Sequence, residues 1–186
     1  PESDYGNVAV AQFQQAAAAR GVRVIAIERY STGGALAAAQ RIAALGSQAD
    51  ALFIPEQADQ MPAVAQALAS AGVDPKRIQI LGTGLWNDAR VLRLPQLQGG
   101  WFAAPENGGF NAFAAKYRAK FNSDPTRIAT LAYDAISLAA ALGAQGLGYG
   151  ESVLTNSSGF NGADGLFRFR PDGQNERGLS VFQVRD

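Results

Sequence analysis

The sequence lacks histidine and cysteine altogether, in a chain of 186 residues. These absences exclude Ser-His-Asp triads, cysteine nucleophiles and zinc sites built from imidazole or thiolate ligands. Because histidine is the commonest general base, an enzyme built on this sequence would have to use carboxylate or lysine chemistry. We therefore expect a protein that is not an enzyme and that uses no metal and no cofactor.

An excess of charge of either sign is also missing, because 16 basic residues balance 16 acidic ones. No basic stripe marks a surface for nucleic acid or for an anionic membrane. No apolar run approaches the roughly 18 residues of a membrane span. With 47% hydrophobic residues, the chain can bury a good core. We expect a globular protein with no nucleic acid partner and no transmembrane segment.

The pattern of residues 51–87 predicts a strand–helix–strand unit, and the rest of the fold is organised around it. A short apolar strand at 51–54 is followed by an amphipathic helix at 60–70 and a second strand at 79–81. Parallel neighbouring strands need a crossover of this length. Further elements alternate around this unit, namely a helix at 7–19, a strand at 22–27, a helix at 35–45 and a strand at 99–104. The alternation predicts an α/β fold with a doubly wound parallel sheet.

The sequence after residue 104 predicts two longer helices, a short one at 151–156 and a terminal β-hairpin. The first helix carries an aromatic stripe that we interpret as ordinary core, formed by Phe110, Phe113, Tyr117 and Phe121. The second helix is mostly apolar, and Asp134 within it needs a partner if buried, so we expect a structural hydrogen bond. The hairpin is expected to pair residues 167–170 with residues 179–184.

A doubly wound unit normally begins with a strand, but this sequence begins with a loop and a helix. In the common strand order 2-1-3-4-5 the first strand lies inside the sheet. Without it, the strands at 22–27 and 51–54 have no shared partner, and unpaired buried backbone is costly. We infer that the chain is a piece of a longer one, or that another segment supplies the strand.

The loops after the two central strands are the expected place for a ligand, because ligands of open α/β sheets bind beyond the carboxyl ends of the strands. Glu56 and Gln57 could offer a carboxylate and an amide, although a solvated loop is the alternative. Thr83, between two glycines, could present a hydroxyl group and backbone N–H groups. Trp86 could stack on a ligand or could equally cover the core.

Five segments of the sequence resemble the type I periplasmic binding proteins, in their leucine/isoleucine/valine-binding branch. They are Asp4-Tyr5-Gly6 before a helix and residues 50–54, 80–86, 132–136 and 162–184. The resemblance runs from the first residue to the last. Residues 81–86, 99–105 and 164–173 are most similar to a bacterial subgroup named as activators of penicillin-binding proteins.

The resemblance implies two α/β lobes hinged around a cleft. Residues 1–104 and 161–186 would form the second lobe without its first strand, and residues 105–160 a helical segment returning to the first lobe. A small polar solute, such as an amino acid or a related compound, would be captured in the interlobe cleft for an ABC transporter permease. The implied location is periplasmic or extracytoplasmic, with the first lobe and any signal peptide or lipid-attachment cysteine upstream. The alternative is an envelope lipoprotein that activates a peptidoglycan synthase and has a vestigial cleft.

The resemblance also bears on single residues. Tyr5 matches a tyrosine that faces the ligand in the amino-acid-binding relatives, the alternative being a tyrosine that packs at a helix start. Gly84 stands where those relatives carry an acid for the ammonium group of the ligand, which puts an α-amino acid in doubt unless Glu56 or Asp88 substitutes. The predicted ligand-binding residues are Tyr5, Glu56, Gln57, Thr83, Gly84 and Trp86.

Overall fold

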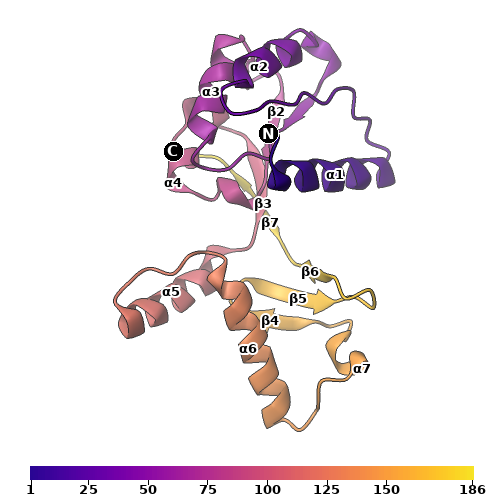
Figure 1. Ribbon diagram of the computed structural model, residues 1–186, viewed down its shortest axis with the longest axis vertical. Helices are drawn as coiled ribbons and strands as arrows, with labels where there is room; N and C mark the ends of the chain where they lie inside the picture. Colours follow the sequence, from indigo (N-terminus) through magenta and orange to yellow (C-terminus); the bar gives the residue numbers. More distant parts are fainter. The chain divides into compact units, whose positions relative to one another are not determined.

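The computed structural model describes all 186 residues and divides them into two compact units. The first unit comprises Pro1–Ala104 and Val181–Asp186, and the second comprises Pro105–Ser180. Figure 1 shows that the chain leaves the first unit after β3 and returns to it as β7, so both termini belong to the first unit. The assignment of residues 1–104 and 161–186 to one lobe and of residues 105–160 to the other stays a prediction.

The first unit is built on a four-stranded sheet with the order β1-β2-β3-β7. Its strands are β1 (Ala51–Phe53), β2 (Gln79–Gly82), β3 (Trp101–Ala104) and β7 (Ser180–Gln183). The pairs β1–β2 and β2–β3 are parallel. Helix α3 (Met61–Ser70) joins β1 to β2, with a proline in its first turn and a left-handed glycine, Gly72, just after its end. The predicted βαβ unit and the α/β fold class are confirmed.

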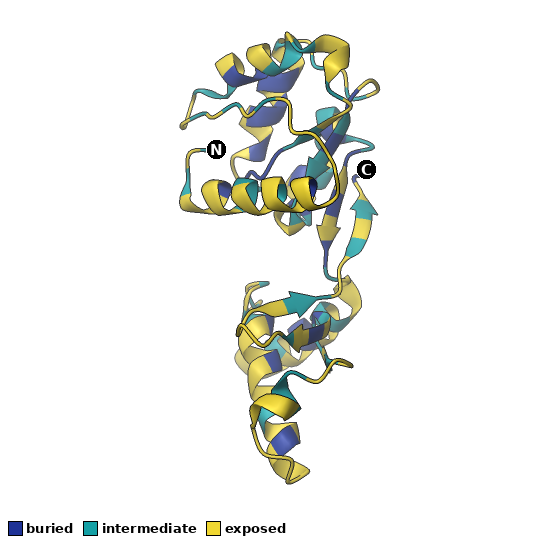
Figure 2. Ribbon diagram, turned by 90° about the vertical axis from the view of Figure 1, so that its right-hand side faces the viewer, coloured by how far each residue is buried: buried dark blue, intermediate teal, exposed yellow.

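The core of the first unit lies between this sheet and the helices beside it, as the buried segments in Figure 2 show. Helix α3 buries Met61, Val64 and Leu68 on one face, and β2 and β3 contribute Ile80 and Phe102. The spacing of the α3 residues is the helical period that the sequence shows. Short elements complete the unit, namely η1 (Gly46–Gln48), η2 (Gly84–Trp86), α4 (Ala89–Leu92) and η3 (Pro95–Leu97).

Two further helices of the first unit, α1 (Asp4–Ala19) and α2 (Ala35–Ala43), form where the sequence predicts them. The strand predicted at residues 22–27 does not form, and this prediction is wrong for the present chain. Residues 23–29 make no backbone–backbone hydrogen bond. The reason is the missing neighbour, since a strand exists only through the ladder it shares with another strand.

The second unit contains α5 (Asn107–Phe121), α6 (Ala129–Ala144), α7 (Glu151–Leu154) and an antiparallel sheet of β4 (Phe160–Gly162), β5 (Gly165–Phe169) and β6 (Asn175–Arg177). The predicted return strand of the hairpin is wrong. Strand β6 pairs with β5, whereas residues 180–183 cross to the sheet of the first unit as β7. A turn closed by the N–H of Arg170 and the carbonyl oxygen of Gln174 brings the chain back early enough for β6 to pair.

Asp134 of α6 is buried, and its hydrogen bonds are structural, as predicted. Its Oδ1 accepts a hydrogen bond from the backbone N–H of Ala163 at 2.6 Å, and its Oδ2 lies 3.4 Å from Nη1 of Arg177. Gly162 leaves the room for this carboxylate, because a Cβ at that position would come within 2.5 Å of it. The carboxylate therefore joins α6 to the turn between β4 and β5 and to strand β6.

Candidate functional site

The start of α1 and the end of β2 meet at the carboxyl edge of the first unit's sheet. Ser3 caps the helix by accepting a hydrogen bond from the N–H of Gly6 at 3.1 Å, and this fixes the position of Tyr5 in the first turn. The phenol of Tyr5 donates a hydrogen bond of 2.7 Å to Oγ1 of Thr83, 78 residues further along the chain. Two residues predicted separately to bind a ligand are thus brought together.

The hydroxyl group of Thr83 retains a proton that it can donate. Its oxygen accepts from the phenol of Tyr5 and, at 3.4 Å, from the backbone N–H of Leu85, where Thr83 caps η2. A hydroxyl group offers one proton and two acceptor positions. With both acceptor positions used, the proton of Thr83 is available to an acceptor oxygen on a bound molecule.

Glu56 lies in the loop after β1, and its carboxylate is turned into the protein. It is buried and accepts hydrogen bonds from the phenol of Tyr30 and from the backbone N–H of Gln57, each at 2.8 Å. Tyr30 is not among the site residues that the sequence predicts. Its position just after the segment 22–27 was the available signal, because it places Tyr30 at the same edge as the other strand-end loops.

The pKa of Tyr30 is raised above its usual value, first by burial and then by the hydrogen bond to the carboxylate of Glu56. The folded protein therefore keeps the phenol proton at a pH where the unfolded chain loses it. The stabilisation from Tyr30 is complete below about pH 10, the ordinary tyrosine pKa, and falls as the pH rises above it.

We expect the free energy of unfolding to decrease between about pH 10 and pH 11, and to do so less in Tyr30→Phe, which has no phenol to titrate. Urea unfolding of both proteins across this pH range measures the difference. Tyr133→Phe, an exposed tyrosine in the second unit, serves as the control for the loss of a phenol. Equal pH dependence in the parent protein and in Tyr30→Phe would contradict the assignment.

A cavity of about 500 Å³ opens beside Glu56 and Gln57 and is also lined by Tyr30, Ser31 and Thr32. Its only charged lining side chains are acidic, Glu2, Glu56 and Asp59. Tyr5 and Thr83 do not line this cavity. The predicted site residues therefore form two groups at the sheet edge, Tyr5 with Thr83 and Glu56 with Gln57.

The remaining predicted residues have different surroundings. Gln57 and Gly84 are exposed, and a Cβ on Gly84 would lie 3.3 Å from the carbonyl oxygen of Ala103, a tight approach to β3. Trp86 is fully buried in the core, which is the alternative that the sequence left open for it. Asp88 caps α4 and pairs with Arg90 at 2.8 Å, and the hydrogen bond from the Arg90 side chain lowers the pKa of Asp88.

The whole chain, residues 1–186, matches the sequence model of a family described as periplasmic binding protein. The chain belongs to this family. Among curated proteins, none has a significant sequence match. Membership of the periplasmic binding protein family implies an extracytoplasmic location, and no helix of this family member has the length and apolar character needed to cross a membrane.

Solved structures of solute-binding proteins share the fold of this periplasmic binding protein. A leucine-binding protein from Thermotoga maritima matches all of the chain with a TM-score of 0.65 at 19% identity. Two ABC transporter solute-binding proteins from Rhodopseudomonas palustris also match. One, in complex with 3,4-dihydroxybenzoic acid, covers 97% of the chain with a TM-score of 0.61 at 23% identity, and the other, in complex with benzoate, covers 99% with a TM-score of 0.60 at 17% identity. The chain spans 55% of the length of the first structure and 53% of each of the others.

Proposed function

We propose that this chain is the solute-binding part of a non-enzymatic periplasmic binding protein that delivers a small polar solute to an ABC transporter permease. The observation that carries the proposal is the hydrogen bond between Tyr5 and Thr83, which gathers two hydroxyl groups at the carboxyl edge of the sheet. In open α/β sheets this edge is where ligands bind. Solute binding at this edge would shift the equilibrium between open and closed lobes toward the closed form. A permease would then distinguish the closed form from the open one.

The chemistry of the edge favours a solute with acceptor oxygens, such as a carboxylate. The available proton of the Thr83 hydroxyl suits such a group, and Tyr5 holds that hydroxyl in place. An amino acid or a related compound meets this requirement, and so do the aromatic acids bound by two of the structural neighbours. Gly84 offers no carboxylate to an ammonium group, so an α-amino group would need another acid at this edge, such as the buried Glu56.

Solute binding should weaken when either hydroxyl is removed. We expect Tyr5→Phe and Thr83→Val each to raise the Kd about five- to tenfold, the usual effect of losing one hydrogen bond. Isothermal titration calorimetry on the full-length protein, with leucine, benzoate and 3,4-dihydroxybenzoate as probes, measures the change. Tyr133→Phe, which removes an exposed phenol from the second unit, is the matched control and should leave the Kd unchanged.

Failure of the full-length protein to bind any of these acids would count against the proposed solute class. Binding that is unaffected by both Tyr5→Phe and Thr83→Val would count against the proposed site. None of the three structures compared above is described as an activator of a peptidoglycan synthase, so these three lend no support to the alternative of an envelope lipoprotein. Attachment through a lipid-bearing cysteine remains a prediction from the resemblance.

A further inference from the structure

A single basic residue lies in the loops that follow the segment 22–28, β1 and β2. These loops are residues 29–34, 54–60 and 83–88, and Arg29 is the only lysine or arginine in them. Its loop is joined to the loop after β1, because the phenol of the next residue, Tyr30, donates a hydrogen bond to Glu56. Arg29 is exposed. A positive charge is therefore accessible at the edge of the sheet where the proposed function places the solute.

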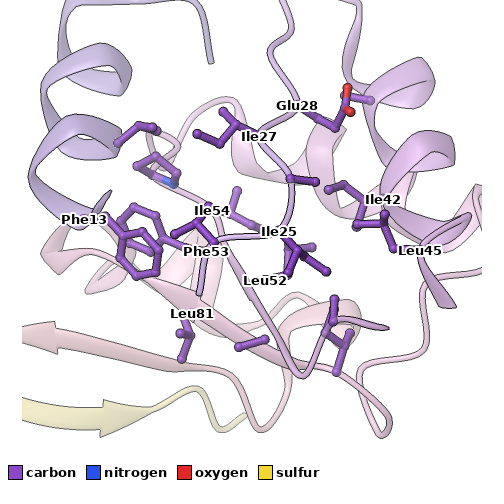
Figure 3. Close-up of a pocket in the computed structure, with 18 of the residues that line it drawn as sticks. Phe13, Ile25, Ile27, Glu28, Ile42, Leu45, Leu52, Phe53, Ile54 and Leu81 are labelled. Carbon is purple, nitrogen blue, oxygen red and sulfur yellow. The ribbon is translucent and has the colours of Figure 1, made fainter. Parts of the chain in front are cut away.

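The side chain of Arg29 turns toward α1. Figure 3 shows Phe13 of α1 on one side of the segment that leads to this residue, and Glu28 turned to the other side. There the carboxylate of Glu28 pairs with Arg41 of α2. The guanidinium of Arg29 donates a hydrogen bond of 2.6 Å to Oδ1 of Asn7 on α1. The acid next to Arg29 in the sequence thus pairs with a different arginine.

The charge of Arg29 is not neutralised by any carboxylate of the chain. Its hydrogen-bond acceptor, Asn7, is neutral, and Arg29 forms no ion pair. The carboxylate of Glu56 accepts from Tyr30 and from the backbone N–H of Gln57 instead. A guanidinium has five N–H donors in a planar fork, and the contact with Asn7 uses only one of them. The remaining donors suit a carboxylate, which a guanidinium can bind with two parallel hydrogen bonds.

The start of α1 lies between Arg29 and the Thr83 hydroxyl. Tyr5 of this helix contacts Thr83, and Asn7 contacts Arg29. Residues two apart in an α-helix project about 200° apart around its axis, so the two contacts lie on opposite sides of α1. Their separation is on the order of 10 Å, the diameter of a helix with its side chains. One acid group cannot reach both donors, whereas a solute with two separated acid groups can.

We infer that Arg29 is a further solute-binding residue and that the solute is a dicarboxylic acid. One acid group would accept the proton of the Thr83 hydroxyl, and the other would bind the guanidinium of Arg29. A solute with a single acid group would leave one of these donors unused. The inference rests on the proposed function, because it uses the same edge of the sheet, and it narrows the class of solute.

Two matched pairs of acids test the inference by isothermal titration calorimetry on the full-length protein. Benzene-1,4-dicarboxylate is compared with benzoate, and hexanedioate with hexanoate, so each pair differs by one acid group. We expect the dicarboxylate of at least one pair to bind about tenfold more tightly, the gain from one charge-assisted contact. Equal Kd values within both pairs, or no binding of either dicarboxylate, would overturn the inference. The proposed function would still stand if leucine or benzoate binds.

Arg29→Gln distinguishes a contact with the solute from a structural role. This variant should lose the advantage of the dicarboxylate and leave the Kd of the matching monocarboxylate unchanged. Arg23→Gln removes an exposed arginine from the same segment, and as the matched control it should change neither Kd. An advantage that persists in Arg29→Gln would overturn the inference. Equal weakening of both acids would also overturn it, because damage to the fold affects all solutes alike.

Discussion

Replacing Trp86 with alanine should lower the free energy of unfolding of the first unit by about 3–5 kcal/mol, the usual cost of truncating a buried tryptophan. Trp86 is fully buried, and its ring fills the space above Gly82 between β2 and the residues before β3. Urea unfolding followed by the fluorescence of Trp101 measures the loss, because Trp101 is the other tryptophan and lies on β3 of the same unit.

Two control variants make the Trp86 prediction specific. Leu85→Ala changes an exposed neighbour and should alter stability by no more than about 0.5 kcal/mol. Trp86→Phe keeps an aromatic ring and removes an indole N–H that has no hydrogen-bond partner. It should therefore lower the free energy of unfolding much less than Trp86→Ala does. A loss below about 1 kcal/mol for Trp86→Ala would contradict the packing described for this residue.

The effects of substituting Gly82 and Trp86 on the free energy of unfolding should not be additive. A Cβ on Gly82 would lie 2.1 Å from the indole ring, so Gly82→Ala forces the ring to move. The double variant Gly82→Ala/Trp86→Ala should therefore be less destabilised than the sum of the two single variants, because the clash disappears with the ring. Strictly additive losses would show that the glycine is needed for another reason.

Replacing Asp134 with alanine should destabilise the second unit by about 3–5 kcal/mol, the usual cost of removing one partner of a buried ion pair. The change leaves the backbone N–H of Ala163 and the guanidinium of Arg177 without their acceptor. Both tryptophans lie in the first unit, so far-UV circular dichroism in urea should report the loss while the Trp101 fluorescence transition changes little.

Two further aspartate variants distinguish the effect of losing the buried carboxylate from the effect of losing any negative charge. Asp134→Asn keeps an acceptor oxygen for Ala163 but not the charge. Its free energy of unfolding should therefore lie between those of the parent protein and of Asp134→Ala. Asp124→Ala removes an exposed carboxylate that pairs with Arg118 and should cost less than about 1 kcal/mol. Similar losses for Asp124→Ala and Asp134→Ala would refute the proposed role of burial.

The sequence predicted best the elements whose formation is decided locally. Helix α3 has a helical apolar period, a proline at its start and a glycine after its end, and it forms between β1 and β2 as expected. The strand expected at residues 22–27 has an equally apolar sequence, but it needs a distant neighbour and does not form. The hairpin fails for a related reason, since residues 180–183 alternate like a partner for β5 but pair beside β3.

The candidate site was predictable in its location but not in its contacts. The rule that ligands bind beyond strand ends selected Thr83 and Glu56, and the resemblance to a family selected Tyr5. Only the structure shows that Tyr5 reaches Thr83, whereas Glu56 is held by Tyr30. Trp86 could not be assigned from its position alone, because a tryptophan after a strand suits a ligand and a core equally well.

The insertion of the second unit between β3 and β7 has a consequence for synthesis on the ribosome. Val184 is completely buried in the core of the first unit, and it exchanges backbone hydrogen bonds with Gly99 and Gly100. These contacts join residues more than 80 positions apart, so they form only after the entire second unit has been translated. The core of the first unit can thus gather from residues 1–104 early in translation, but its sheet is completed by β7 only at the end.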